Sequence, residues 1–193
     1  IDAANYRYPR NDIPYPTCGV SGYCLTKDPY YLEDSFGRVA KQRGFGSLWM
    51  VARKSYDFRV KHLAGQIEQY FKSRGIRHKR ALVCGVAYKS NIDDIRDSHG
   101  VAIARELAKR GMLVSIWDPW IVVGPAGFRS YKKATDAFKG KDVAVFAVAH
   151  SQFRRAVSDM RRLSGLMRSR LIYDGAGLFR GKPDPNASYD LIG

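Results

Sequence analysis

The sequence lacks the long apolar segments that membrane and secreted proteins carry. No apolar run approaches the roughly 20 residues that a membrane-spanning helix needs, and no basic-then-apolar leader opens the chain. The chain begins with Ile1 rather than methionine, as expected of a fragment or a processed piece. We therefore predict a protein that does not act within a membrane.

Cysteine and histidine are scarce and scattered. The three cysteines, Cys18, Cys24 and Cys84, are an odd number at irregular spacing, which does not fit a disulfide framework and favours a reducing compartment. The four histidines show neither an HExxH motif nor a zinc-type spacing with cysteine. The sequence therefore predicts a cytoplasmic protein without a metal site.

Acidic residues are also few. The 193 residues include 18 Asp and Glu against 33 Lys and Arg, which gives a net charge of +15. This surplus attracts polyanions such as nucleic acid, acidic membrane or phosphorylated small molecules, and a merely solvated basic surface is an equal alternative. No helix-turn-helix, RNP or zinc pattern indicates specific nucleic-acid binding. With 45% hydrophobic and 12% aromatic residues, the chain can form a packed core.

The first part of the chain predicts an extended loop and a long helix. Residues 1–37 are rich in Pro, Tyr, Gly and Asp, and we expect an ordered loop that leads into a short helix. Residues 47–73 predict a long helix, because apolar residues recur there at steps of three and four. This apolar stripe consists of Val60, Leu63, Ala64, Ile67 and Phe71. It needs a partner surface in the following domain, in a missing domain or in a second copy of the chain.

From residue 79 onward, strands and helices alternate. We expect buried strands at 81–87, 112–117, 142–148 and 171–174. Helices are expected between them, the first beginning after Ser98, which suits a helix cap. This alternation predicts an α/β fold, a Rossmann-like parallel sheet with helices on both faces, preceded by the extended loop and the long helix.

The loop after the first of these strands is a candidate anion site. Residues 88–98 offer Lys89, Arg96 and the amides of a helix start, which together suit a phosphate or another anion. The alternative is that Asp93, Asp94 and Arg96 pair with one another and cap the helix. The glycine-rich dinucleotide fingerprint is missing here, because only Gly85 follows the strand.

Cys24 is the second candidate for chemistry. Lys27 and Asp28 follow it by one helical turn, and a nearby cation favours the nucleophilic thiolate. The alternative is an inert buried cysteine beside an ordinary surface ion pair of little energetic consequence. At the end of the second strand, Asp118 stands where a ribose-binding acid would lie, which alone is weak evidence.

Two motifs carry a resemblance to a known family. Residues 19–32, GVSGYCLTKDPYYL, resemble the active-site cysteine segment of the UDP-glucose/GDP-mannose dehydrogenase family, which commonly reads GVGGHC or GFGGSC. Residues 8–10, Tyr-Pro-Arg, look like the His-Pro-Arg that precedes this segment in the aminosugar members. Residues 85–98, GVAYKSNIDDIRDS, resemble the signature GLAYKxNxDDxRxSP, which opens the family's UDP-binding domain.

The resemblance implies an NAD-dependent nucleotide-sugar 6-dehydrogenase of polysaccharide biosynthesis. Such enzymes oxidise the C6 alcohol of a UDP-sugar to a carboxylate through a cysteine thiohemiacetal and a thioester. By position, Cys24 would be the nucleophile, Asp28 would act in acid–base work, and Lys27 would lie near the cofactor and the anionic intermediate. The implied substrate-binding residues are Gly19, Val20, Ser21, Gly22, Tyr88, Lys89 and, reaching into the neighbouring subunit, Arg10. Arg96 would reach the NAD.

The resemblance also implies an organisation. Residues 1–78 would hold the active-site cysteine loop and a central helix, near 47–73, on which such enzymes form homodimers, and residues 79–193 would form the UDP-binding Rossmann-like domain. The family binds NAD mainly through an amino-terminal domain that this chain lacks, so the chain alone is expected to be incomplete.

Some positions depart from the family pattern. Ser21-Gly22-Tyr23 replaces Gly-Gly-His, and Ala176 stands where the family has a substrate-contacting arginine, for which Arg180 is a nearby substitute. These departures favour the alternative of a non-catalytic nucleotide-sugar-binding or interaction module.

Overall fold

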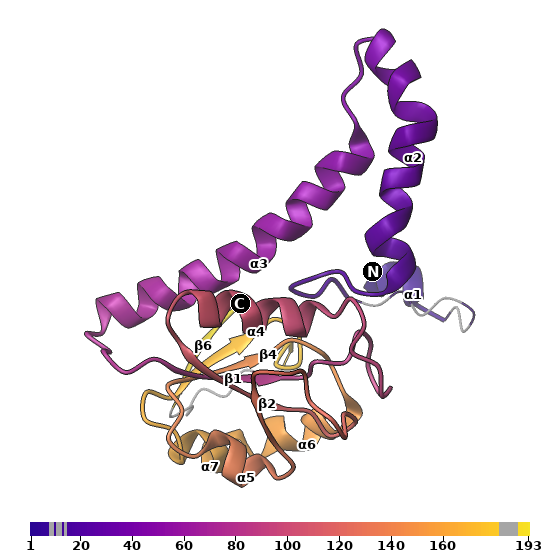
Figure 1. Cartoon of the computed structure of the whole chain (residues 1–193). Coiled ribbons are helices and arrows are strands. Elements are labelled where there is room, and N and C mark those ends of the chain that lie inside the picture. Colours follow the sequence, from indigo (N-terminus) through magenta and orange to yellow (C-terminus); the bar gives the residue numbers. More distant parts are fainter. Residues whose placement is uncertain (8–9, 11–12, 14, 182–188) are drawn as a thin grey trace.

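The computed structural model describes residues 1–7, 10, 13, 15–181 and 189–193. A one-turn helix, α1 (Asp2–Asn5), is followed by two long helices, α2 (Tyr23–Gln42) and α3 (Leu48–Ser73). Figure 1 shows these two helices projecting as an open hairpin from an α/β body. Among the described helices, none combines the length and the apolar character needed to cross a bilayer.

Helix α2 is the largest difference from the sequence prediction. It has 20 residues, so the expectation of a short helix at the end of a loop is wrong. The helix begins after Gly22, whose φ of 96° lies in a region that favours glycine. It continues through Pro29, which removes one backbone donor but does not end the helix. The helical turn that carries Cys24 is therefore the first turn of a long element.

Helix α3 forms as predicted. Its amino-terminal cap is Ser47, whose hydroxyl accepts a hydrogen bond from the amide of Met50. The helix ends before Gly75, which has a φ of 63°. The whole predicted apolar stripe is buried, and it packs into the core formed by α4 and the sheet. The partner surface is therefore the following α/β unit.

The sheet has six strands, all parallel, in the order β3-β2-β1-β4-β5-β6. Four match the predicted strands in place and type: β1 (Arg80–Cys84), β2 (Leu113–Trp117), β4 (Val143–Phe146) and β5 (Leu171–Asp174). The expected first strand is too long, because the chain turns at Gly85, whose φ is 90°. Two three-residue edge strands, β3 (Arg129–Tyr131) and β6 (Asp190–Ile192), were not predicted.

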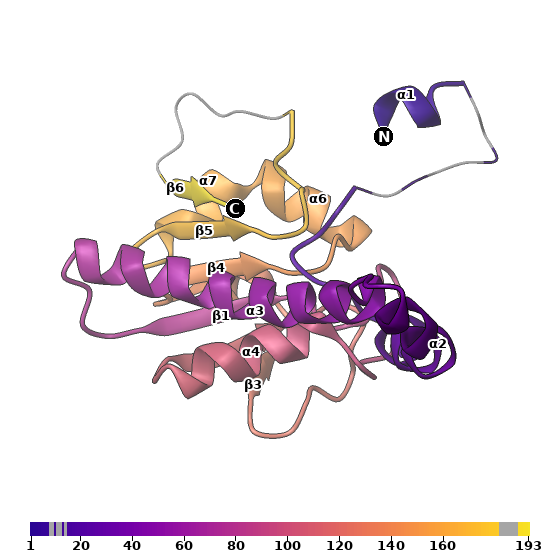
Figure 2. The same cartoon turned by 90° about the horizontal axis from the view of Figure 1, so that it is seen from above.

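Helices cover both faces of the sheet, which confirms the predicted fold class (Figures 1 and 2). One face packs against α3 and α4 (His99–Lys109), and the other against α5 (Ala134–Phe138), α6 (Ser151–Ser158) and α7 (Met160–Gly165). Side chains alternate along β1, so that Ala81 and Val83 join one core while Leu82 and Cys84 join the other. Helix α4 begins at Ser98, as predicted, because its hydroxyl accepts hydrogen bonds from two first-turn amides.

Candidate functional site

A cavity of about 830 Å³ lies at the carboxyl ends of the central strands. The order of the strands reverses between β1 and β4, and ligands of open parallel sheets bind at such a switch point. The loop after β1 contributes Tyr88, Lys89 and Ser90, and the segment after β4 contributes residues 147–149. The volume falls within the range of about 300–1,000 Å³ that is usual for small-molecule sites.

The cavity is lined by cations and has no acid among its described lining residues. Lys89 follows β1, Arg154 lies on α6, and Arg180 follows β5. None of the three forms an ion pair with another described residue. Positive charges from two loops and one helix therefore converge on one space, an arrangement that attracts an anion.

Asp118, at the end of β2, fixes the loop that carries Lys89. Its Oδ2 accepts hydrogen bonds from the amides of Val86 (2.7 Å) and Ala87 (3.1 Å) and from His150 Nε2 (3.1 Å). Burial opposes ionisation of this carboxyl, but the bonds from His150 and Val86 lower its pKa below the ordinary value. Oδ2 of the carboxylate that stands where a ribose-binding acid would lie is thus already bonded to three donors of the protein itself.

His150 extends this network to the next turn of the same loop. Its Nδ1 accepts a hydrogen bond from the amide of Asn91 (2.9 Å), and its Nε2–H donates to Asp118. The amide oxygen of Asn91 in turn accepts from the amide of Ser151 (2.9 Å). The network joins the ends of β1, β2 and β4 and leaves Lys89 directed to the cavity.

Arg96 lies in a different cavity from Lys89. Its guanidinium and its amide donate to the carboxylate of Asp94, with Nη2–Oδ2 at 2.7 Å, and this bonding lowers the pKa of Asp94. The pairing alternative therefore holds for these two residues. A second cavity, of about 490 Å³, contains Arg96 together with Arg53 and Arg105. The Nε and Nη1 atoms of Arg53 are buried and have no hydrogen-bond partner among the described residues.

The segment before Cys24 forms one wall of the 830 Å³ cavity. Gly19, Val20 and Ser21 line it. Gly22 lies close to the ring of Tyr88. A Cβ added at this glycine would be 3.5 Å from the ring. The predicted substrate-binding residues from the two motifs thus come together, although 66 or more positions separate them in the sequence.

The predicted catalytic residues lie beside this cavity and outside its lining. Cys24 is exposed on the first turn of α2, and the next residue, Leu25, reaches the cavity. The ammonium of Lys27 lies 2.7 Å from the carboxylate of Asp28, and this hydrogen bond raises the pKa of Lys27. The same ammonium lies over the ring of Tyr31, 5.0 Å from its centroid. An exposed cysteine and a partly buried ion pair therefore lie together at the start of the helix.

Arg10 contributes to neither cavity. It is exposed, and Tyr8 and Pro9 of the same motif lie outside the described residues. Its predicted reach into a neighbouring subunit stays a prediction.

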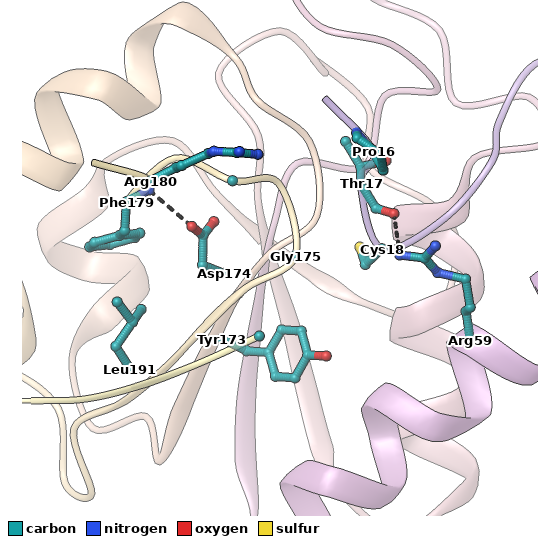
Figure 3. A pocket seen from close by; sticks show the side chains of 12 residues that line it. Pro16, Thr17, Cys18, Arg59, Tyr173, Asp174, Gly175, Phe179, Arg180 and Leu191 are labelled. Atoms are coloured by element: carbon teal, nitrogen blue, oxygen red, sulfur yellow. Dashed lines mark hydrogen bonds between the residues drawn. The ribbon is translucent and has the colours of Figure 1, made fainter. Parts of the chain in front are cut away.

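Figure 3 shows a further cavity, which shares Pro16, Thr17 and Arg180 with the first. Its volume is about 490 Å³. Within it, the carboxylate of Asp174 accepts hydrogen bonds from the amides of Leu178 and Phe179, each at 2.9 Å. These bonds hold the turn that places Arg180 over the ring of Tyr15, 3.9 Å from its centroid. Cys18 is buried beside this turn, and burial raises the pKa of its thiol to about 12.

Sequence reasoning missed Arg154 and Tyr15 as lining residues, and it named Arg180 only as a possible substitute. The structure places Arg180 at the cavity and leaves Ala176, 7% exposed, in its wall. His99 was also missed, although it lines the cavity and contacts Ser21. A usable signal was present, because position 99 is a proline in the signature that residues 85–98 resemble.

Comparison with known proteins agrees with this geometry. A model of the UDP-glucose/GDP-mannose dehydrogenase family, UDP binding domain, matches residues 82–181. NDP-N-acetyl-D-galactosaminuronic acid dehydrogenase of Ralstonia nicotianae is 28% identical over 185 residues, which cover 94% of this chain and 40% of that protein. UDP-N-acetyl-D-mannosamine dehydrogenase of Methanococcus aeolicus is 29% identical over 177 residues, covering 90% of this chain and 37% of that protein.

A solved structure shows the same fold. The UDP-D-ManNAc dehydrogenase from Pyrococcus horikoshii superposes with a TM-score of 0.72 at 24% identity, over 96% of this chain and 41% of that one. The chain therefore spans about 40% of the length of the curated relatives and the structure that it matches.

Proposed function

Because the chain belongs to the UDP-glucose/GDP-mannose dehydrogenase family, we propose that the 830 Å³ cavity binds the nucleoside diphosphate of a UDP-sugar. The observation that carries this proposal is the convergence of Lys89, Arg154 and Arg180 on a space with no described acid. A hydrogen bond between a charged pair contributes about 1.5–3 kcal/mol.

Arg180 takes the part of the arginine that the family carries at position 176. Both positions line the cavity, and the Asp174 turn brings Arg180 to it from four residues further along the chain. The guanidinium already lies over the ring of Tyr15, which limits the conformational entropy that the side chain would lose on binding. On this proposal, the cation that contacts the substrate comes from a different sequence position but reaches the same cavity.

The chemistry proposed for the whole enzyme is oxidation of the sugar C6 alcohol to a carboxylate. When bound, NAD⁺ accepts a hydride in each of the two oxidations. Between them the Cys24 thiolate adds to the C6 aldehyde and forms a thiohemiacetal oxyanion. Loss of its C6 hydrogen as the second hydride gives the thioester. Asp28 takes a proton from the water that hydrolyses the thioester, and the Cys24 sulfur leaves as a thiolate. The ammonium of Lys27, held by Asp28, stabilises the negative charge that develops on the former carbonyl oxygen.

The residues around Arg96 fit a phosphate-bearing cofactor. The cavity they share holds the guanidinium groups of Arg53, Arg96 and Arg105, with Asp97 as the acid that lines it. The buried Nε and Nη1 of Arg53 lack partners, and a pyrophosphate oxygen would supply them. Arg96 would therefore contact the NAD from this part of the enzyme, with Arg53 and Arg105 beside it.

A homodimer through α3 is proposed as well. The amino-terminal half of α3 exposes Leu48, Val51 and Phe58, while its carboxyl-terminal half packs on the sheet. Large exposed apolar side chains along one helix are typical of an interface. In this arrangement residues 1–78 form the cysteine loop and dimer unit, and residues 79–193 form the UDP-binding unit.

A second candidate function is binding without turnover. It is favoured by the position of Cys24, Lys27 and Asp28, which lie outside the lining of the cavity. An assay of the full-length gene product, including any NAD-binding domain encoded upstream of Ile1, with a UDP-sugar and NAD⁺ and with NADH absorbance as the readout, separates the two candidates. NADH formation that Cys24→Ala abolishes and Cys18→Ala retains supports the enzyme, and its absence supports the binding module.

The binding step is tested by calorimetric titration with UDP. We expect Lys89→Ala to weaken the affinity about 10- to 150-fold, which corresponds to the loss of one charge-assisted bond. The matched control is Lys54→Ala, an exposed lysine of α3 that lies outside the cavity, and we expect less than a twofold change. A folded parent chain that binds no UDP would overturn the proposal.

A further inference from the structure

Ser21 and His99 form a close polar contact between the cysteine segment and the α/β body. The hydroxyl of Ser21 accepts a hydrogen bond from the amide of His99 at 2.7 Å and lies in hydrogen-bond contact with Nδ1 of the same residue. On the other side of the ring, Nε2 lies 2.6 Å from the carbonyl oxygen of Ala147, at the end of β4. One imidazole thus joins the cysteine segment, the first turn of α4 and the end of β4.

The positions of the hydrogens follow from these partners. A carbonyl oxygen can only accept, so Nε2 carries the proton and donates to Ala147. In a neutral ring Nδ1 then accepts, and the Ser21 hydroxyl donates to it. Burial lowers the pKa of His99, which keeps the ring neutral at pH 7. Every polar group of the pair is satisfied in this one arrangement.

The cysteine segment lies directly on this ring. A Cβ added at Gly19 would lie 2.5 Å from the Cβ of His99, a distance that no side chain tolerates. Gly19 and Ser21 therefore both contact His99, and the wall of the cavity has little freedom to move away from it. Cys24 follows Ser21 by three residues, so this contact also fixes where α2 begins.

Both members of the pair depart from the family pattern. The cysteine motif has glycine where this chain has Ser21, and the signature has proline where it has His99. Position 99 is the first residue of α4, where proline fits because that amide has no partner within the helix. Glycine with proline therefore leaves neither an amide nor a hydroxyl to satisfy, and serine with histidine satisfies both. Within the contact between positions 21 and 99, only the mixed combinations leave orphaned groups, whereas the carbonyl of Ala147 loses the His99 donor in every proline variant.

We infer that Ser21 and His99 act as one positioning unit, which holds the wall of the UDP cavity and the start of the Cys24 helix against α4. This inference rests on the proposed function for its effect on UDP binding, and the contact itself does not depend on it. Removal of one partner leaves a buried polar group of the other unsatisfied, whereas joint replacement removes both.

The test is a double-mutant cycle with Ser21→Gly, His99→Pro and the double variant that restores the family residues. UDP affinity is measured by calorimetry, and hydrogen exchange is followed at residues 15–23. We expect each single variant to weaken UDP binding about 10-fold and to speed exchange of the segment. The double variant should lose clearly less than the product of the two single effects.

The matched control is Ser35→Ala, an exposed serine of α2, which should leave both measurements unchanged. Effects that multiply in the double variant, or single variants that match the parent in exchange and affinity, would overturn the positioning unit. If the parent binds no UDP, the exchange measurements alone decide on the unit, so the two proposals fail separately.

If His99→Pro does not fold, Ser21→Ala and Ser21→Thr provide the same decision. Threonine keeps the hydroxyl that bonds the ring and alanine removes it, so threonine should restore slow exchange and UDP affinity that alanine loses. Equal behaviour of the two variants would count against the unit.

Discussion

Asp118→Asn provides a strict test of how the binding loop is held. Oδ2 of Asp118 accepts from Val86, Ala87 and His150, and Oδ1 accepts from the amides of Trp120 (2.9 Å) and Ile121 (3.3 Å). An amide offers only one accepting oxygen, and the best choice keeps it toward the three donors. The two remaining amides would then face an NH₂ group. These two bonds are partly buried, a hydrogen bond to a charged group contributes about 1.5–3 kcal/mol, and the longer bond to Ile121 is the weaker one. We therefore expect a loss of about 2–4 kcal/mol in unfolding free energy.

The loss should depend on pH in a defined direction. The pKa of Asp118 is lower in the folded protein than its ordinary value, so its ionised form contributes stability above about pH 4. That contribution disappears as the pH falls through the folded pKa, because the wild-type carboxyl becomes protonated. Asparagine does not titrate, so the difference between the two proteins should be full at pH 7 and should shrink below about pH 4.

Urea denaturation followed by circular dichroism at pH 7 and pH 3 measures this difference. The control is Asp159→Asn, whose carboxylate forms an exposed pair with Arg162 and whose replacement should cost at most about 0.5 kcal/mol. A difference below about 1 kcal/mol at pH 7, or one that is the same at both pH values, would refute the role assigned to Asp118.

Three further predictions follow from close contacts and from burial. Gly100→Ala places a Cβ 2.3 Å from the carbonyl oxygen of Gly85 and should cost about 2–4 kcal/mol in thermal unfolding, whereas Gly165→Ala, with no atom within 4 Å, should be neutral or stabilising. Asp174→Ala removes the two hydrogen bonds that hold the Arg180 turn and should weaken UDP binding severalfold in calorimetry, about as much as Arg180→Ala does. Iodoacetamide should label Cys24 in the native protein and label Cys18 and Cys84 only after unfolding, as read by peptide mass spectrometry, because both are buried and burial raises their thiol pKa values.

The fold was largely predictable because its signals are local. A buried strand, a capped helix and a glycine stop are each encoded within about 12 residues, and their alternation indicates a parallel sheet. The elements that were missed lack such signals. Strands β3 and β6 have three residues each and no apolar run. The length of α2 was missed because Pro29 reads as a helix breaker, whereas the structure tolerates it in the seventh position of the helix.

The site was predictable only where one segment carries several functional groups. The loop with Tyr88 and Lys89 offers a cation and a helix start together, and it lines the cavity. Arg154 and Arg180 lie on separate elements, and nothing in their own neighbourhoods marks them. The contact between Ser21 and His99 spans 78 positions, so a reading of either segment alone could not find it.

The parallel arrangement of the strands explains why such distant residues meet. Every strand of the sheet ends at the same edge, so each strand-to-helix loop can deliver one side chain to the cavity without any change in the core. A cation can then move along its own loop, as we propose for position 176 and Arg180, provided that the turn is rebuilt, here by the Asp174 carboxylate. Residues through which two loops contact each other cannot be changed one at a time in this way. Ser21 and His99 touch each other in a buried space, so a change in one requires a matching change in the other. Among relatives of this chain, we therefore expect charged residues that line the cavity to be substituted independently of one another. Residues of a packed polar pair, such as positions 21 and 99, should be substituted together.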